Sequence, residues 1–246
     1  MKWRTAISEV EHGKESIRGY ELTSLMAKKS FSDVVFLVLR GTLPSAAEAR
    51  MMDALLVACI DHGIGVASAV VSRLTASTGN SLHTALASGI LAFGKLHGGA
   101  AQDAAEFFSS QKDTADIDVL IGSLKEKKIR VPGYGHKVLL EDSRVTALCA
   151  KARELGFFGT YCEFALMVEK SLNAVSSKKL PLNIDGALAA VLLDMGFDPI
   201  QARGVFLIGR VPGLIAHIHE EMTQGPGLRR LREDEYEYTG GKNKKI

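Results

Sequence analysis

The sequence KKLPLNIDGALAAVLLDM at 178–195 changes from polar to apolar near its middle. The polar part ends with Asn183-Ile184-Asp185-Gly186, and the apolar residues that follow predict a helix over 186–195. Asp185 therefore stands at an expected helix start, where an aspartate is an ordinary N-cap. The alternative role of this carboxyl group is to move a proton to or from carbon. Gly196 follows the last apolar turn and suits the end of the helix.

Three further polar islands flanked by glycine interrupt the apolar sequence. They are Asp61-His62-Gly63, Leu96-His97-Gly98-Gly99 and Pro132-Gly133-Tyr134-Gly135-His136. Glycine allows the chain to turn tightly and to expose a polar side chain. Three imidazoles and one carboxylate can serve as the base for a C–H proton, the donor to an oxyanion and the acid or base for a hydroxyl group. The islands together indicate the chemistry of carbon acids.

Between the islands, the residue pattern predicts helices, and no alternation typical of strands stands out. Ser45-Ala-Ala-Glu48 predicts a capping box, and Asp198-Pro199 predicts another helix start. The helices that we expect cover 32–40, 46–58, 65–75, 81–95, 100–111, 117–128, 144–155, 161–174, 186–195, 199–208 and 213–221. We therefore expect an all-α fold. The charged tail from Gln224 is either an ordered arm or a frayed end, and its composition favours fraying.

The composition excludes several classes of protein. Of the 246 residues, 46% are hydrophobic and 24% are charged, which is the balance of an ordinary globular protein. A formal net charge of +2 gives no reason to expect a nucleic-acid partner. No apolar run approaches the ~18 residues of a membrane span, and the N-terminus lacks the pattern of a signal peptide. Three scattered cysteines without zinc spacing predict buried free thiols, no metal site and a cytoplasmic protein.

The order and wording of the islands resemble the citrate synthase family. They are most similar to its citryl-CoA-cleaving branch, which includes the C-terminal module of ATP-citrate lyase. Residues 178–195 and Asp61-His62-Gly63 resemble that module, whereas His97 is more typical of citrate synthases. The resemblance implies a citrate synthase-like fold, with a large helical domain formed by 1–97 and 211–246. A small helical domain formed by 98–210 is inserted into it.

The resemblance also implies catalytic roles for three residues. His97 would donate a hydrogen bond to the thioester oxygen as it becomes an enolate. Asp185 would transfer the proton of the acetyl methyl carbon, and His136 would bind and protonate or deprotonate the hydroxyl oxygen of the four-carbon acid. The residues alone favour a histidine that satisfies the carbonyls at a helix end, and it is the resemblance that favours the catalytic role of His97.

Four other residues would bind substrate carboxylates. The resemblance assigns this role to His62, Arg144, Arg210 and an arginine of the second subunit, for which a gap-free alignment selects Arg230. Arg210 lies in an apolar stretch, and burying it without a partner would cost several kcal/mol. Its partner is either a substrate carboxylate or an internal Asp or Glu. The resemblance further implies that a loop binds coenzyme A through its backbone, namely Val131, Pro132, Gly133, Tyr134 and Gly135.

We therefore expect a citryl-CoA lyase, which cleaves citryl-CoA to acetyl-CoA and oxaloacetate. One alternative is a citrate or 2-methylcitrate synthase, and another is a non-catalytic subunit that binds CoA esters. We expect no permanently bound cofactor, because the coenzyme A thioester is substrate or product. The resemblance implies a homodimer with a shared active site. A citryl-CoA synthetase is a candidate partner, because no ATP-grasp part is recognisable in the sequence.

Overall fold

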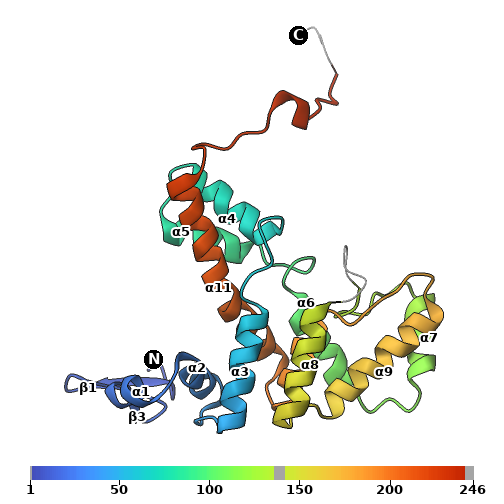
Figure 1. The fold of residues 1–246 in the computed structure, drawn as a ribbon, viewed down its shortest axis with the longest axis horizontal. Helices are drawn as coiled ribbons and strands as arrows, with labels where there is room; N and C mark the ends of the chain where they lie inside the picture. Colours follow the sequence, from blue (N-terminus) through green and yellow to red (C-terminus); the bar gives the residue numbers. More distant parts are fainter. Residues whose placement is uncertain (1, 136–141, 242–246) are drawn as a thin grey trace. The chain divides into compact units, whose positions relative to one another are not determined.

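The computed structural model describes residues 2–135 and 142–241 of the chain, and most of these residues lie in helices (Figure 1). The elements are, in chain order, β1 (Ser8–Glu11), β2 (Lys14–Ile17), β3 (Tyr20–Glu21), α1 (Leu22–Lys28), α2 (Phe31–Arg40), α3 (Ala46–Ala58), α4 (Ala67–Ser77), α5 (Leu82–Leu91), α6 (Ala100–Gln111), α7 (Ile117–Glu126), α8 (Ser143–Leu155), α9 (Thr160–Val175), α10 (Ile184–Asp194), α11 (Pro199–Gln224) and the short 3-10 helix η1 (Glu233–Glu235). The predicted helical fold is confirmed.

A small antiparallel sheet precedes the helices, and the expectation that the chain lacks strands is wrong there. β1 pairs with β2 and β2 pairs with β3. Every residue of β1 is exposed, so this strand has no buried face that would require alternating apolar residues. A usable signal was His12-Gly13, because both residues have positive φ, 51° and 76°, as a two-residue hairpin turn of type I′ requires.

The predicted helix ends agree with the structure at several points. Ser45 and Glu48 form the expected capping box of α3. Asp198 accepts a hydrogen bond from the backbone N–H of Gln201 at 2.8 Å, as expected for an N-cap. The expected separate helices at 199–208 and 213–221 are instead one helix, α11, with Pro212 inside it. Proline normally ends a helix because it has no N–H. Here buried residues on both sides of it, such as Phe206 and Leu214, favour the continuous helix.

Helix α10 forms the centre of a compact region. Ile184 and all residues from Gly186 to Leu193 are buried, and the helix packs against α6, α8 and α9. A helix that is apolar on every side can be stable only in such an interior position. The polar-to-apolar change at 178–195 therefore marks the point where the chain enters the core.

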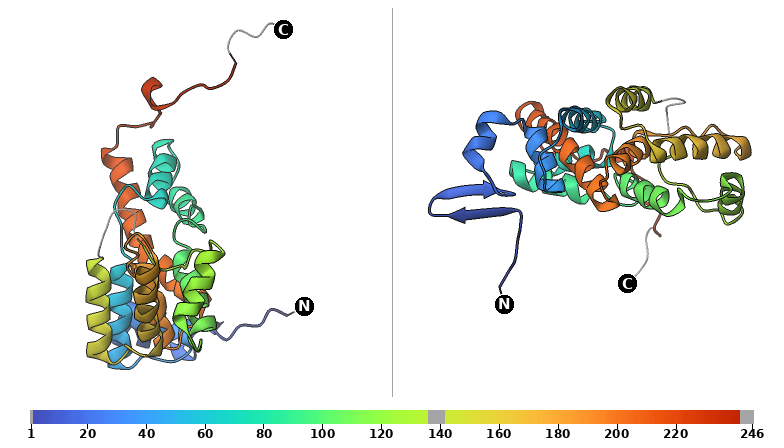
Figure 2. Two further views of the ribbon diagram at one scale, coloured as in Figure 1. Left: turned by 90° about the vertical axis from the view of Figure 1, so that its right-hand side faces the viewer. Right: turned by 90° about the horizontal axis from the view of Figure 1, so that it is seen from below.

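Contacts divide the chain into two compact units. The first unit comprises Met1–Asp61 and Phe93–Pro212, and the second comprises His62–Ala92 and Gly213–Ile246. These limits differ from those of the two domains that the resemblance implies, and that domain division stays a prediction. In the second unit, α4 and α5 lie side by side (Figure 2). Ala76 and Ala85 pack with Ile218 of α11.

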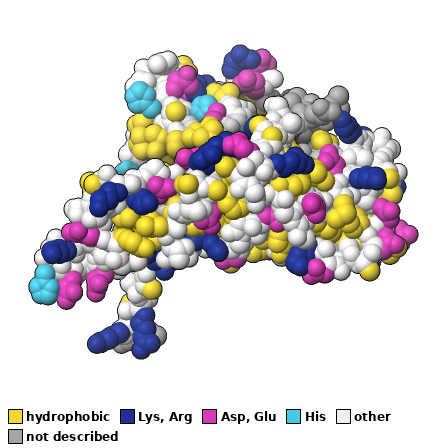
Figure 3. All heavy atoms as spheres, turned by 60° about the horizontal axis from the view of Figure 1, so that its bottom comes forward, with side chains coloured by type: hydrophobic (Ala, Val, Ile, Leu, Met, Phe, Trp, Pro, Cys, Tyr) yellow, Lys and Arg dark blue, Asp and Glu magenta, His cyan; other side chains and the backbone are white. Residues whose placement is uncertain are grey.

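On the face drawn in Figure 3, basic and acidic side chains are interspersed, which agrees with the small net charge of +2. Within 2–135 and 142–241, every helix is either too short or too polar to cross a membrane.

Candidate active site

Asp185 lies in the first turn of α10 but does not cap this helix. The N-cap is Asn183, whose Oδ1 accepts a hydrogen bond from the backbone N–H of Gly186 at 3.1 Å. The interpretation of Asp185 as an ordinary N-cap is therefore wrong. Its half-buried carboxyl group stands at the positive end of the helix dipole, where negative charge is favoured.

The loop at 131–135 is bound to the segment that begins α10. The backbone N–H of Asn183 donates to the carbonyl of Gly133 at 3.0 Å, and the side-chain amide of Asn183 donates to the carbonyl of Gly135 at 3.1 Å. In return, the N–H of Gly135 donates to the carbonyl of Pro181 at 2.7 Å. Two of the four polar islands thus lie against each other.

Close approach explains the glycines of both segments. A Cβ atom on Gly186 would lie 2.5 Å from the carbonyl oxygen of Gly133, and one on Gly133 would lie 2.9 Å from the Cα of Gly186. Gly133 also has a φ of +85°, which residues with a side chain rarely adopt. No other residue type fits at either position without moving the loop away from Asp185.

Tyr134 anchors this loop from inside the protein. Its hydroxyl donates to the carbonyl of Ala165 at 2.8 Å, and the edge of its ring meets Phe108. Burial raises the pKa of Tyr134 well above its ordinary value. The side chain of Tyr134 therefore fixes the loop. A ligand could bind only to the backbone of this residue. His136, the next island residue, lies outside the described residues.

His97 sits in a tight turn between α5 and α6. The N–H of Gly94 donates to the carbonyl of His97 at 2.7 Å, and the N–H of His97 donates back at 3.0 Å. The imidazole stacks on Phe93, with the ring centres 5.0 Å apart. Gly98 is required beside it, because a Cβ atom there would lie 2.2 Å from the ring of Phe93. The turn therefore fixes the plane of the imidazole.

Arg210 is buried in α11, where its Nε donates to the carbonyl of Cys59 at 2.7 Å. Burial lowers the pKa of this guanidinium, and the carboxylates of Asp61 and Asp185 act in the opposite direction. Arg144 is close enough to lower it as well. Arg210 thus has the carbonyl of Cys59 as a hydrogen-bond partner, and the charges of Asp61 and Asp185 raise the pKa of its guanidinium.

The thiol of Cys59 lies within the same electrostatic field. Its burial is the main reason that its pKa rises to about 12, and the charge of Asp185 adds to the rise. Arg210 and Arg144 oppose it. The charges of three predicted site residues, Asp185, Arg144 and Arg210, therefore all act on the thiol of Cys59, which sequence reasoning left out of the site.

Arg144 has an internal partner that sequence reasoning missed. Asp142 accepts from Nε of Arg144 at 2.9 Å and from Nη2 at 2.8 Å, and it also caps α8. The Asp142 carboxylate is almost completely buried. A fork of this kind fixes the plane of the guanidinium. The spacing of Asp142 and Arg144, two residues apart at a helix start, was the available signal.

Asp194, the last residue of α10, also has a role that sequence reasoning missed. Its carboxylate accepts from the backbone N–H groups of Gly159, Tyr161 and Cys162, each at 3.0 Å. It thereby satisfies the N-terminus of α9, whose first N–H groups have no partners within the helix. The aspartate at the end of the 178–195 stretch thus ties two core helices together.

A cavity of about 420 Å³ adjoins the loop at 131–135. Val131 and Tyr134 form part of its lining, together with apolar residues of α7 and α9. Three cationic residues also line it, namely Lys125, Lys128 and Arg130. The ammonium group of Lys125 donates to the carbonyl of Val175 at the end of α9. Apolar walls with a few cations suit a ligand that has a flat apolar part and phosphate groups.

Two predicted site residues belong to the second unit. His62 and Arg230 are both exposed there. The proximity of either residue to Asp185 stays a prediction.

Known proteins share the sequence pattern and the fold of this chain. Residues 44–232 match the family described as "Citrate synthase, C-terminal domain". The structure of citryl-CoA lyase from Hydrogenobacter thermophilus is 42% identical, with a TM-score of 0.94, and the match covers 99% of this chain and 97% of that one. ATP citrate lyase from Methanothrix soehngenii, solved with citrate and coenzyme A, is 26% identical with a TM-score of 0.86, over 98% of this chain and 42% of that one.

A curated plant relative matches a smaller share. ATP-citrate synthase beta chain protein 1 from Arabidopsis thaliana is 32% identical over 193 residues, which are 70% of this chain. The match spans 31% of that relative, or about a third of its length. The resemblance inferred from the polar islands is thus confirmed, and the chain belongs to the citrate synthase family.

Proposed function

We propose that this protein is a citryl-CoA lyase that cleaves citryl-CoA to acetyl-CoA and oxaloacetate in the cytoplasm. The observation that carries the proposal is the hydrogen bonding of the loop at 131–135 to Pro181 and Asn183, directly before α10. It holds a loop suited to a coenzyme A thioester beside Asp185, the carboxyl group suited to proton transfer at carbon. The similarity to a citryl-CoA lyase over nearly the full length of both chains supports the same reaction.

In the proposed cleavage, His136 accepts the proton of the tertiary hydroxyl group. The electron pair of that O–H bond forms the ketone of oxaloacetate as the C–C bond breaks. The pair of the C–C bond moves into the enolate of acetyl-CoA, whose oxygen accepts a hydrogen bond from His97. Protonated Asp185 then gives its proton to the enolate carbon, which completes acetyl-CoA.

The carboxylates of the substrate need fixed positive charge. The charges of Arg144, Arg210 and Asp185 all affect the pKa of the buried Cys59 thiol. A guanidinium can bind a carboxylate through two parallel hydrogen bonds. We assign both arginines to the oxaloacetate part of the substrate. His62 of the same subunit and Arg230 of a second subunit complete the set in a homodimer with shared sites.

We assign the cavity beside the loop to the nucleotide end of coenzyme A. The apolar walls suit the adenine ring of coenzyme A, and the cationic side chains of Lys128 and Arg130 suit its phosphate groups. Coenzyme A then enters and leaves as part of substrate and product, and no permanently bound cofactor is needed. Citryl-CoA must be made elsewhere, so a separate citryl-CoA synthetase is the candidate partner.

The test is the partition of products from citryl-CoA. A lyase yields oxaloacetate, which malate dehydrogenase and NADH report, and it releases little free thiol. The matched control is Asp185→Asn, because Asn183 and not Asp185 caps α10 and the variant should fold normally. Binding of citryl-CoA without any product would overturn the lyase and would favour the non-catalytic subunit.

A citrate or 2-methylcitrate synthase is the second candidate, and the presence of His97 and the family match to citrate synthase favour it. Both activities share the carbon chemistry and differ in whether water reaches the thioester. A synthase given citryl-CoA would release citrate and free thiol, and it would convert oxaloacetate and acetyl-CoA efficiently to citrate. If free thiol is the main product from citryl-CoA, the protein is a synthase and not a lyase.

The shared site has a separate test. Arg230→Ala and Asp185→Asn chains, each inactive alone, should regain activity when mixed, because each mixed dimer holds one intact site. Proven subunit exchange without recovered activity would exclude Arg230 from acting in the neighbouring subunit.

A further inference from the structure

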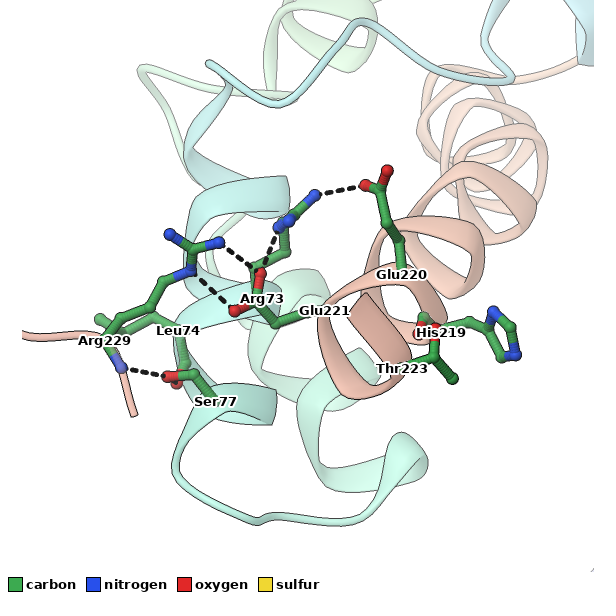
Figure 4. A network of polar contacts seen from close by, with 8 residues as sticks. All are labelled: Arg73, Leu74, Ser77, His219, Glu220, Glu221, Thr223 and Arg229. Atoms are coloured by element: carbon green, nitrogen blue, oxygen red, sulfur yellow. Dashed lines mark hydrogen bonds and ion pairs between the residues drawn. The ribbon is translucent and has the colours of Figure 1, made fainter. Parts of the chain in front are cut away.

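Glu221, in the last turns of α11, is a buried carboxylate held by two arginines of the second unit (Figure 4). Its side chain has no exposed surface. Nε of Arg73 in α4 donates to Oε2 at 2.7 Å. From the tail, Nε of Arg229 donates to Oε1 at 2.7 Å and Nη2 donates to Oε2 at 2.8 Å. Both oxygens are therefore paired, which burial of a carboxylate requires.

The backbone around this group is shaped to the same contact. The chain leaves α11 at Gly225, where a Cβ atom would lie 2.7 Å from Oε1 of Glu221. The backbone N–H of Arg229 donates to the hydroxyl of Ser77 in α4 at 3.3 Å. Ser77 is itself fixed, because its hydroxyl donates to the carbonyl of Leu74. Arg229 is thus held by its side chain and by its backbone.

Beyond this contact the tail has little else to hold it. Every residue from 226 to 241 is exposed, including Leu228 and Leu231. The start of the tail is not frayed, contrary to what its composition favours, and the reason is a buried carboxylate that lies outside the tail. Without the charge of Glu221, the guanidinium groups of Arg73 and Arg229 would lose the carboxylate that they share and would repel each other.

We propose that Glu221 is a positioning residue, which binds Arg229 and thereby sets the direction in which the adjacent Arg230 leaves the subunit. The inference rests on the proposed function, in which Arg230 contacts the substrate bound by a second subunit. Arg229 and Arg230 then have different tasks, since Arg229 holds the tail and Arg230 contacts the substrate. Glu221 itself does not touch the substrate.

The experiment compares Glu221→Gln with Glu220→Gln in the full-length protein. Glu220 also binds Arg73, but its side chain is half exposed and has no contact with Arg229. In Glu221→Gln, we expect amide hydrogen exchange over 225–231 to become about tenfold faster, the scale of one lost hydrogen bond to a charged group. The KM for citryl-CoA should rise by a similar factor with kcat nearly unchanged, and Glu220→Gln should resemble the wild type in both readouts.

Two further variants keep the test decisive. Arg229→Gln leaves Glu221 paired with Arg73, so it should fold even if Glu221→Gln does not, and it should show the same fast exchange and raised KM. Wild-type exchange and KM in Glu221→Gln or Arg229→Gln, together with lost substrate affinity in Arg230→Ala, would overturn the positioning role alone. If Arg230→Ala also keeps full substrate affinity, the tail does not contribute to the active site. That part of the proposed function then fails together with the inference.

Discussion

The loop at 131–135 in the first unit and the tail after Gln224 in the second unit are irregular segments, and each is held at one end of a helix by different chemistry. The loop is held by backbone hydrogen bonds to 181–183 and by glycines that permit contact at van der Waals distance. The tail is held by charged side chains around Glu221. The loop contact should therefore respond to added volume and the tail contact to lost charge.

The largest effect should come from Asp185→Asn, which removes the transferable proton beside the loop without changing the shape of the side chain. We expect kcat to fall at least ~10³-fold, equal to roughly 4 kcal/mol of barrier. The melting curve and the affinity for coenzyme A should stay unchanged, because Asn183 supplies the cap. Normal turnover would remove Asp185 from the chemistry and would leave the loop contact with a structural role only.

The thiols distinguish the two units, because all three cysteines lie in the first unit. The rise in the pKa of Cys59 from 9.0 to about 12 lowers its thiolate fraction. At pH 8 this should slow its labelling roughly a thousandfold relative to a free thiol. Labelling by a maleimide, followed by mass spectrometry, measures this rate. Fast labelling of folded protein would show that the interior around Arg210 opens readily.

Added volume should weaken the loop contact. In Gly186→Ala the new methyl group would lie 2.5 Å from the carbonyl oxygen of Gly133, so we expect a loss of about 1–3 kcal/mol in unfolding free energy. Gly122→Ala in α7 is the matched control, because nothing lies within 4 Å of its Cβ position. Alanine should be neutral or stabilising there, by up to ~1 kcal/mol. Urea denaturation compares the two, and equal stabilities would mean that the loop moves aside without cost.

Acid should release the tail and spare the loop. The hydrogen bonds from Arg229, followed by those from Arg73, hold the pKa of Glu221 below its ordinary value of 4.5. Because the pKa is lower in the folded state, the contact contributes its full stability above pH 4.5 and loses it as the pH falls through the lower folded value. The NMR chemical shift of the Arg229 Nε–H should be that of a hydrogen-bonded group at pH 5 and should move to that of a free arginine at a pH below 4.5. The shift of a free arginine already at pH 5 would show that Glu221 does not hold the tail.

Patterns close in sequence predicted much of the fold. Ser45 and Glu48 predicted the start of α3, and the apolar run after Gly186 predicted a buried helix, since both patterns are local. The exposed strand β1 was missed because it has no buried face, and the continuity of α11 through Pro212 was missed because packing outweighs local preference. Capping was one of two roles left open for Asp185, and the structure gives it to Asn183, because either residue could cap a helix that begins one or two residues earlier or later.

The sequence by itself determined the family, the helical character and the set of imidazoles, carboxylates and arginines from which a site can be built. Only the tertiary structure decided which of them meet. Asn183 donates a hydrogen bond to Gly135, which lies 48 positions earlier in the chain. Arg73 reaches Glu221 across 148 residues. Such contacts depend on distances across the fold, and local residue patterns carry no record of those distances. The same reason explains why local patterns do not select Arg229, rather than the adjacent Arg230, as the residue that binds Glu221.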